Sequence, residues 1–151
     1  MRDDLYLKVA SDARLLCAIR GLMRGYLERH DYEEDRIQEI VLALDEACAN
    51  AIRHSYEGKN DQYIEVLVCS DAARIEICLK DQGKPTNEDK LNKRVPEAPD
   101  PGNLKAGGLG IPLIYAIFDE VRFEPGKTRG NCTTLRLNRP SSGPDETART
   151  S

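Results

Sequence analysis

A carboxylate and a carboxamide, Glu46 and Asn50, lie one helical turn apart in a segment with helical periodicity, and Arg53 follows them. On a helical wheel the three side chains fall within about 60° of one another and point away from the apolar stripe. An amide oxygen is a hard ligand that suits Mg²⁺, and a carboxylate can accept a proton from a nucleophilic hydroxyl or from water. The alternative is an ordinary solvated helix face. Against it, Leu42 shares this face and small alanines flank it, which suits close approach by another molecule.

The second candidate is the sequence Asp81-Gln82-Gly83, which ends a segment of alternating apolar and polar residues. Asp81 is in phase with the apolar residues, so its side chain is predicted to project from the covered face of a strand. A carboxylate there is costly unless it is hydrogen-bonded, and a purine amino group would supply such a bond. Gly83 would let a ligand approach the backbone closely. The alternative is that Asp-x-Gly is only a turn after a strand.

The third candidate is the glycine run Gly107-Gly108-Leu109-Gly110 at the start of another helical segment. Glycines at a helix N-terminus expose backbone N–H groups to a phosphate, and the helix dipole favours the anion. The run is not a Walker A loop, because no Gly-Lys-Ser or Gly-Lys-Thr follows it. A purely structural glycine cluster is the alternative.

The fourth candidate is Thr133, in the last alternating segment of the chain. It shares parity with Leu135 and Leu137, so its hydroxyl is predicted to face the same side of the sheet as Asp81. A threonine whose hydroxyl is satisfied within the core is the structural alternative.

Hydrophobic periodicity predicts the elements that must position these residues. The helix that carries Glu46 has its apolar residues at i, i+3, i+4 spacing. The strand that ends in Asp81 is predicted to form a hairpin with the strand before it. The full predicted order is a strand at Leu5–Val9, a helix capped by Ser11 or Asp12 and ending near Arg29, a helix at Tyr32–Ser55, strands at Tyr63–Cys69 and Arg74–Asp81, a helix from Gly108 to Phe118, and strands at Glu120–Phe123 and Cys132–Asn138.

Two segments depart from this periodicity. Residues 84–106 are rich in proline and charge and poor in apolar residues, which is typical of a long functional loop or lid. Residues 140–151 are rich in Ser, Thr, Pro and Gly and are predicted to be a disordered tail. Residues 1–139 are then one domain. Because the helices are grouped and the strands join mostly by hairpins, an α+β class fits better than a doubly wound parallel sheet.

The bulk composition limits the possible functions. A chain of 151 residues that is 40% hydrophobic and 32% charged is expected to fold as one globular domain, whose core needs neither metals nor disulfides. The net charge is −4 and no basic stripe is present. Direct binding to nucleic acid is therefore not expected, because contacts to the phosphate backbone need clustered Lys and Arg.

The cysteines, the histidines and the N-terminus carry further expectations. Five cysteines are an odd number, and no pair has metal-ligand spacing. Reduced, buried thiols are expected, because Cys17, Cys48 and Cys78 lie among apolar residues. Two histidines argue against a Zn site. The acidic N-terminus lacks a signal-type apolar core, and no apolar run approaches the roughly 18 residues that span a bilayer. We therefore expect a cytoplasmic protein that has no contact with a membrane.

The order of the four candidates along the chain is more specific than any one of them. It resembles the superfamily of gyrase, heat-shock chaperone, histidine kinase and mismatch-repair ATPases (GHKL), and within it most closely the anti-sigma factor serine kinases. The resemblance covers roughly Leu5 to Leu137. It is carried by the segments Asp45-Glu46-Ala47-Cys48-Ala49-Asn50-Ala51-Ile52-Arg53-His54-Ser55-Tyr56, Asp81-Gln82-Gly83-Lys84-Pro85, Gly107-Gly108-Leu109-Gly110-Ile111 and Cys132-Thr133-Thr134-Leu135-Arg136-Leu137.

The resemblance implies a fold and a set of site residues. The fold would be a two-layer α/β sandwich, the Bergerat ATP-binding fold, with a mixed, mostly antiparallel sheet covered by three helices and ATP bound between the layers. Glu46 would be the general base and Asn50 the Mg²⁺ ligand. Asp81, helped by Thr133, would bind the adenine amino group, and Gly83 would line the base pocket. The phosphates beneath the lid would be bound by Gly108, Leu109 and Gly110.

The resemblance also implies partners and an output. The enzyme would use Mg-ATP to phosphorylate a serine or threonine on a small anti-anti-sigma (STAS) domain, and it would bind a sigma factor as the alternative partner. Such proteins regulate transcription by partner switching and are commonly homodimers.

Three features qualify this assignment. Many relatives carry an arginine just before the glycine run, where this chain has Ala106-Gly107. Lys105 is the nearest cation and is the candidate for neutralising the γ-phosphate. Thr86 stands where an aromatic residue is common. His30-Asp31 superficially resembles the phosphoacceptor box of a sensor histidine kinase, but too few residues separate it from Glu46 for a dimerisation hairpin. The remaining alternative is a non-catalytic module that binds nucleotide and a partner protein without phosphotransfer.

Overall fold

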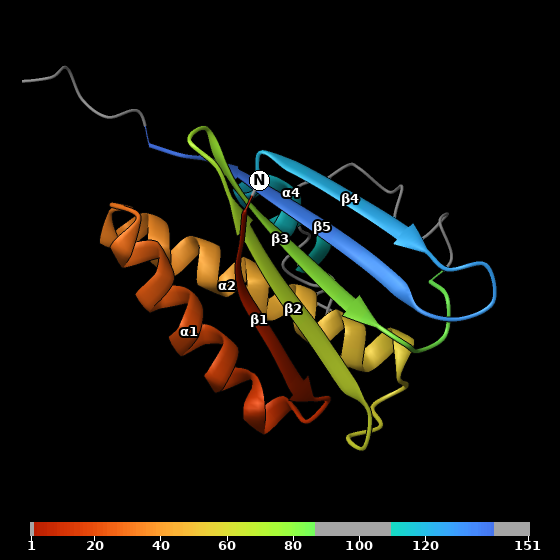
Figure 1. Cartoon of the computed structure of the whole chain (residues 1–151). Coiled ribbons are helices and arrows are strands. Elements are labelled where there is room, and N and C mark those ends of the chain that lie inside the picture. Colours follow the sequence, from red (N-terminus) through yellow and green to blue (C-terminus); the bar gives the residue numbers. More distant parts are fainter. Residues whose placement is uncertain (1, 87–109, 141–151) are drawn as a thin grey trace, which may run out of the picture.

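The computed structural model describes residues 2–86 and 110–140. The part of the expected lid beyond residue 86, the glycines and leucine at 107–109, and the expected tail beyond residue 140 lie outside the described residues. The strands labelled in Figure 1 are β1 (Arg2–Ala10), β2 (Tyr63–Ser70), β3 (Arg74–Asp81), β4 (Glu120–Pro125) and β5 (Asn131–Asn138), and the helices are α1 (Leu16–Arg29), α2 (Glu34–Asn50) and α4 (Gly110–Ile117). The 3-10 turn η1 (Ala13–Leu15) precedes α1, and the π-helical turn η2 (Ala51–Ser55) follows α2. The order β-α-α-β-β-α-β-β predicted from the sequence is confirmed.

The five strands form one sheet in the order β1-β2-β3-β5-β4, and each neighbouring pair is antiparallel. The expectation of a mixed sheet therefore needs correction for the described strands. The physical reason lies in one crossover. The chain passes from β3 through α4 to β4, and these two strands run in the same direction, but β5 lies between them and pairs with both.

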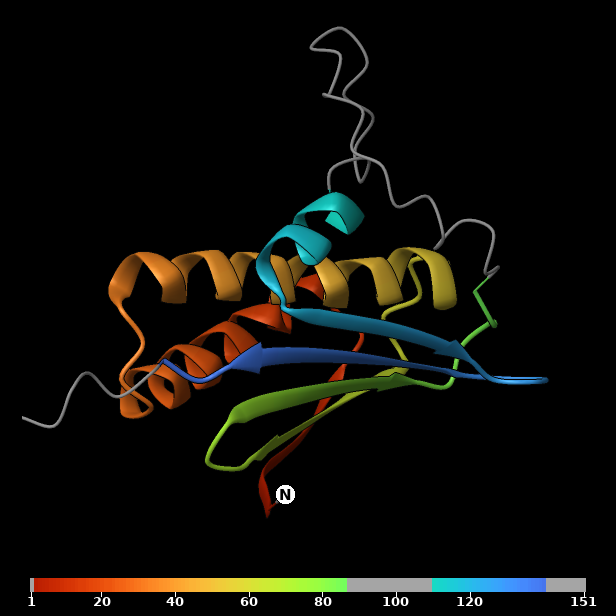
Figure 2. The same ribbon diagram turned by 90° about the horizontal axis from the view of Figure 1, so that it is seen from above.

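The helices cover one face of this sheet, so the domain has two layers (Figure 2). Strict alternation of burial along β2 and β3 produces the covered face. Helix α2 contacts both α1 and α4, and it is the central element of the helical layer. The predicted α+β sandwich is confirmed. The covered face consists of Ile64, Val66 and Val68 of β2, Ile75, Ile77, Leu79 and Asp81 of β3, and Leu135 and Leu137 of β5.

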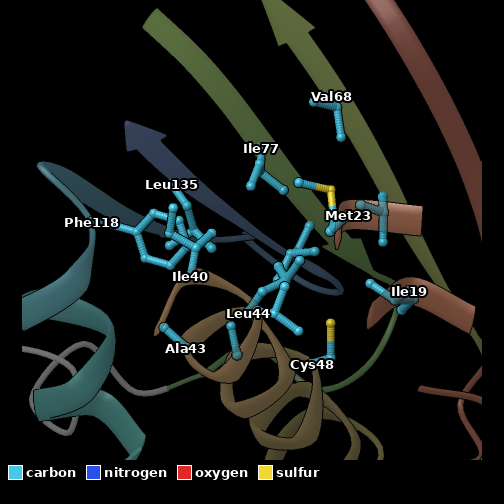
Figure 3. Packing of buried hydrophobic residues seen from close by; sticks show 14 of the residues in the cluster. Ile19, Met23, Ile40, Ala43, Leu44, Cys48, Val68, Ile77, Phe118 and Leu135 are labelled. Carbon is cyan, nitrogen blue, oxygen red and sulfur yellow. The ribbon is translucent and has the colours of Figure 1, made fainter. Parts of the chain in front are cut away.

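The core lies between α1, α2 and this covered face (Figure 3). Met23 of α1, Leu44 of α2 and Ile77 of β3 are essentially inaccessible to solvent. Burying a side chain of this size contributes about 1.5–3 kcal/mol relative to leaving it exposed. This packing holds α2 in place from below, so its opposite face is free to present polar residues.

The cysteines differ from expectation. Cys48 is buried in the core, but Cys17 is exposed, and Cys69, Cys78 and Cys132 are only partly buried. The expectation that these thiols are buried was wrong for these four. Cys17 lies on the exposed face of α1, and parity places the three strand cysteines on the uncovered face of the sheet. All five lie in the described part of the chain, and none of them forms a disulfide there. None of the helices in the described ranges combines the length and apolar character that crossing a bilayer requires.

Candidate functional site

The three polar residues predicted to share one helix face, Glu46 and Asn50 of α2 and Arg53 of η2, do lie together. Arg53 donates from Nη2 to Asn50 Oδ1 at 2.7 Å, and the same nitrogen lies 3.7 Å from Glu46 Oε2. The side chains of Glu46 and Arg53 are 31% and 41% exposed, so both remain accessible to a ligand. The guanidinium of Arg53 therefore lies close to both the amide oxygen of Asn50 and the carboxylate of Glu46.

A π-helical turn follows Asn50 directly and was not predicted from the sequence. In this turn, η2, the backbone N–H of Tyr56 donates to Ala51 O, five residues earlier, at 3.2 Å. Single π turns inside helices occur frequently at functional sites. Here the turn leaves Arg53 exposed on the outer face and directs Ser55 inward, where it is buried against β3.

Gly110, the last residue of the glycine run, lies directly against this face. A β-carbon at residue 110 would stand 2.8 Å from Glu46 Oε2 and 3.5 Å from Asn50 Nδ2. Only glycine fits at this distance without displacing the carboxylate. The structure thus places Gly110, the described residue of the third sequence candidate, beside the first candidate at the N-terminus of α4, where backbone N–H groups favour an anion.

Asp81 ends β3 on the covered face and is 7% exposed. Its Oδ1 accepts hydrogen bonds from Gly83 N at 2.9 Å and Asn131 Nδ2 at 3.0 Å, and its Oδ2 accepts one from Ser55 Oγ at 3.1 Å. Burial raises the pKa of Asp81 above its ordinary value, and the three hydrogen bonds oppose that rise. The prediction that this carboxylate faces the covered side is confirmed. Protein groups donate the three hydrogen bonds, and the purine amino group expected as its partner stays a prediction.

Gly83 makes a close approach to protein backbone. A β-carbon at residue 83 would stand 2.3 Å from the Ser55 carbonyl oxygen, which already accepts the Lys84 N–H at 2.8 Å. Gly83 O in turn accepts the Gly130 N–H at 2.7 Å. The glycine was predicted to let a ligand approach. What the structure shows is that it lets the loop after β3 pack against the end of η2.

The residue opposite Asp81 on β5 is Asn131, which sequence reasoning missed. Strand register pairs Asp81 with Asn131 and Leu79 with Thr133. Thr133 therefore lies on the predicted face, but one step further along the sheet. Asn131 also donates to Ser55 Oγ at 3.0 Å. Asn131 and Thr133 are two residues apart and therefore point to the same face of the strand, which could have revealed Asn131 as a partner of Asp81. The predicted strand, however, began one residue too late, at Cys132.

Tyr56 is a second residue that the sequence did not single out for a role. Its hydroxyl accepts the Gln82 N–H at 2.7 Å and donates to Tyr63 O at 2.6 Å. It therefore links the end of η2 to both strands that bring Asp81 into position. A tyrosine directly after a polar helix end carries no pattern that would reveal such a link.

A cleft of about 430 Å³ opens beside this end of the site. Ser55 and Gly83 line it, together with the cations Lys59, Lys84 and Arg129. Glu46 and Asn50 are not among its lining residues, so the cleft belongs to the Asp81 end of the arrangement. Three further predicted site residues, Lys105, Gly108 and Leu109, lie outside the described residues.

Comparison with known proteins identifies the family of this chain. Residues 9–137 match the family described as the histidine kinase-like ATPase domain. The serine-protein kinase RsbW of Bacillus pumilus is 30% identical over 154 aligned positions, which cover 96% of this chain and 93% of the relative. The chain belongs to the anti-sigma factor serine kinase family. Its four candidate motifs all lie within the matched residues.

Two solved structures share the fold of this anti-sigma kinase family member. One contains the RsbU and RsbW domains of a Mycobacterium tuberculosis protein, with a TM-score of 0.63, 19% identity, and coverage of 93% of this chain and 34% of that one. The other is the SiaB–SiaC complex of Pseudomonas aeruginosa, with a TM-score of 0.63, 15% identity and 90% coverage of both chains. At these identities the likeness bears on the fold alone, and it supports the two-layer sandwich described above.

Proposed function

We propose that this protein is an ATP-dependent protein serine/threonine kinase that binds Mg-ATP, phosphorylates a serine or threonine of an anti-anti-sigma (STAS) partner, and sequesters a sigma factor. The similarity to relatives named serine-protein kinase RsbW supports the reaction class. The positions of the candidate residues support the assignment of roles.

The contact of Gly110 with Glu46 and Asn50 is the observation that carries the proposal. A β-carbon at residue 110 would meet both side chains within 3.5 Å. A phosphate bound at the N-terminus of α4 would therefore lie beside a carboxylate that can accept a proton and an amide oxygen that can bind a cation. An ordinary solvated helix face does not need a glycine of another helix packed against it.

The Asp81 end supplies the binding of the base in this proposal. A carboxylate has about four acceptor positions, and hydrogen bonds within the described part of the chain fill three of them. The remaining position, on Oδ2, suits the amino group of adenine. A hydrogen bond from that group would also offset the cost of keeping Asp81 ionised in a buried place.

Asn50 would bind Mg²⁺, and Glu46 would bind the attacking hydroxyl group. Asn50 Oδ1 accepts one hydrogen bond from Arg53, and its second lone pair remains for a hard cation. When bound, Mg²⁺ would neutralise charge on the triphosphate. The donor set of this chain is small, as is usual for Mg²⁺, which keeps several waters and binds substrate phosphates.

The transfer step that we propose is carried by Glu46. Its carboxylate accepts the proton of the partner's serine hydroxyl as that oxygen bonds to the γ-phosphorus. The bond from the γ-phosphorus to the β–γ bridging oxygen breaks, so the products are a phosphoserine and ADP. Loss of such a general base typically lowers the rate by about 10² to 10⁴.

Arg53 is a cation that could bind the phosphates at the Glu46 end of the site. It touches both Asn50 and Glu46, and it is exposed enough to turn toward a ligand. The sequence offered Lys105 for this role, and that residue remains a prediction. A guanidinium binds phosphate oxygens in a planar, bidentate manner, which suits a transferring phosphoryl group.

The proposed output is partner switching. A phosphoserine adds nearly two negative charges to the partner's surface, and in an interface that change disrupts binding by repulsion and desolvation. We expect the unphosphorylated antagonist to bind this protein and displace a sigma factor. A pull-down with STAS-domain proteins, whose serine is intact or replaced by aspartate, tests this part. Retention of neither sigma factors nor STAS-domain proteins in any nucleotide condition would contradict it.

The decisive experiment is incubation of the protein with labelled ATP, Mg²⁺ and candidate STAS-domain proteins. Wild type should label a serine or threonine of one of them, and Glu46→Ala should lower the rate by about 10² to 10⁴ with little change in ATP affinity. Glu39→Ala is the matched control, because Glu39 is an exposed glutamate on the same helix that pairs with Arg36. It should behave as wild type.

The alternative, a non-catalytic binding module, gives a different result in the same assay. The replacement of the common arginine by Ala106-Gly107 is the observation that favours it. Such a module would bind ATP by calorimetry and would label no partner. An absence of detectable binding at millimolar ATP would contradict both functions.

A further inference from the structure

Two cysteines lie side by side on the face of the sheet that the helices leave uncovered. Cys78 of β3 pairs in register with Thr134, and Cys132 of β5 pairs with Lys80, so the two cysteines are diagonal neighbours on adjacent strands. Their sulfurs are 2.9 Å apart. Both side chains are partly exposed, so small reagents in solvent can reach them.

The surroundings of this pair make one of its thiols acidic. A hydrogen bond from Cys78 lowers the pKa of Cys132 to about 6, with further lowering by Thr134 and by the positive charge of Lys80. Partial burial and Glu124 oppose this shift. The same shared proton raises the pKa of Cys78. The lowered pKa increases the thiolate fraction of Cys132 near neutral pH, and the thiolate is the form that reacts with oxidants.

We propose that Cys78 and Cys132 form a redox modification site, at which a hydroperoxide converts the two thiols to an intramolecular disulfide that a small thiol reverses. The site is separate from the nucleotide site and does not depend on kinase activity. It rests on the 2.9 Å contact between the two sulfurs and on their exposure at one face of the sheet.

The chemistry balances in two steps. The Cys132 thiolate attacks one oxygen of hydrogen peroxide, the O–O bond breaks, and a sulfenic acid forms as hydroxide leaves and takes up a proton. The Cys78 sulfur then attacks the sulfenic sulfur, the S–O bond breaks, and water leaves with the Cys78 proton. Two thiols and one peroxide give one disulfide and two waters. Reduction needs two equivalents of a small thiol, which becomes its own disulfide.

Closing the pair requires only a small movement. An S–S bond is about 2.05 Å long, so the sulfurs must approach by less than about 1 Å. Because the two residues are diagonal, the bond pulls the strands along their length rather than together. Cys132 is the neighbour of Asn131, so the pull displaces Asn131 relative to its partner Asp81, which it contacts at 3.0 Å.

The test is peptide mapping of the full chain by mass spectrometry after treatment with hydrogen peroxide at neutral pH. We expect a linked pair of peptides containing Cys78 and Cys132, with the loss of two hydrogen atoms and reversal by dithiothreitol. Cys78→Ser and Cys132→Ser should each abolish the linkage. Cys17→Ser and Cys69→Ser are matched controls that remove other accessible thiols, and both should retain it.

The pH dependence of alkylation provides a second measurement. In wild type the labelling rate of Cys132 by iodoacetamide should rise with a midpoint near pH 6. Cys78→Ala removes the hydrogen-bond donor, so the midpoint should move upward. A peroxide-treated wild-type protein that carries only separate oxidised cysteines, a different disulfide or five intact thiols would overturn the proposal, as would an alkylation midpoint that does not respond to Cys78→Ala.

A consequence for ATP rests on the proposed function. Displacing Asn131 should weaken ATP binding several-fold in oxidised wild type and leave peroxide-treated Cys78→Ser unchanged. Equal affinity of the bridged and reduced forms would overturn this coupling, although the modification site itself would stand. Failure of both forms to bind ATP would instead contradict the proposed function.

Discussion

Gly110 and Glu46 are in such close contact that a β-carbon at residue 110 would stand 2.8 Å from the Glu46 carboxylate. The two residues are far apart in the sequence and meet only because α4 packs against α2. Every non-glycine residue at this position must displace the carboxylate. The atom that would be hit is the far end of a flexible side chain, so the displacement changes the site more than it changes the fold.

We predict that Gly110→Ala separates stability from activity. The variant should fold with equal or higher stability, since alanine favours a helix over glycine by up to about 1 kcal/mol. Phosphotransfer should fall by about 10²-fold, the effect of misplacing a reacting group by about 1 Å. Thermal unfolding and the labelled-ATP assay measure the two quantities. Gly25→Ala on α1 is the control, because nothing lies within 4 Å of its new β-carbon. Full activity of Gly110→Ala would show that the contact is incidental.

Asp81→Asn should abolish tight ATP binding while keeping the fold. The asparagine can still accept from Gly83 and Asn131, and its amide can donate to the Ser55 hydroxyl. Where the carboxylate would accept a hydrogen bond from the adenine amino group, the asparagine amide presents its own N–H, so that bond cannot form. Calorimetry with Mg-ATP measures the loss. Retention of wild-type affinity would mean that the base binds elsewhere.

The same variant predicts a pH dependence of stability. Burial raises the pKa of Asp81 in the folded protein above its ordinary value of 3.8. Between pH 3.8 and this raised pKa, the folded state therefore binds more protons than the unfolded state. The contribution of Asp81 to the free energy of unfolding therefore falls as pH rises above 3.8. Relative to Asp81→Asn, wild type should lose stability over this range. Urea unfolding of both proteins at several pH values checks the sign, and a difference that grows with pH in favour of wild type would contradict it.

Arg53→Ala should weaken ATP binding by about tenfold to a hundredfold, because hydrogen bonds to charged groups contribute about 1.5–3 kcal/mol. Arg53→Lys should restore part of this, since it keeps the charge but not the bidentate geometry. Arg24→Ala, on α1, removes an exposed arginine that pairs with Glu34 and is the control. If Arg53→Ala binds and transfers as wild type, the phosphates find their cation elsewhere, and Lys105 becomes the candidate.

Gly83→Ala should instead damage the fold. Its β-carbon would stand 2.3 Å from the backbone oxygen of Ser55, which cannot turn away as a side chain can. Overpacking of this kind costs about 1–3 kcal/mol, occasionally more. Urea unfolding measures the loss, and Gly21→Ala on α1 has nothing within 4 Å and should be neutral or stabilising. An unchanged midpoint for Gly83→Ala would mean that the loop after β3 moves freely.

The sequence by itself determined the elements, the class and the order of the motifs. Alternation along β2 and β3 predicted which face is covered, because the side-chain period of a strand is a local property of its backbone. Helical spacing placed Glu46, Asn50 and Arg53 together for the same reason. The motif order identified the family, which the comparisons confirm.

Only the tertiary structure decided what each motif touches. Pairing of β5 with β3 set Asn131, rather than Thr133, opposite Asp81. A register shifted by two residues would keep the same side chains on the covered face, so alternation along the strands does not distinguish the two pairings. The same pairing brought Cys78 and Cys132 together on the uncovered face. Strand order and helix packing join residues distant in the chain, and no local periodicity encodes those contacts.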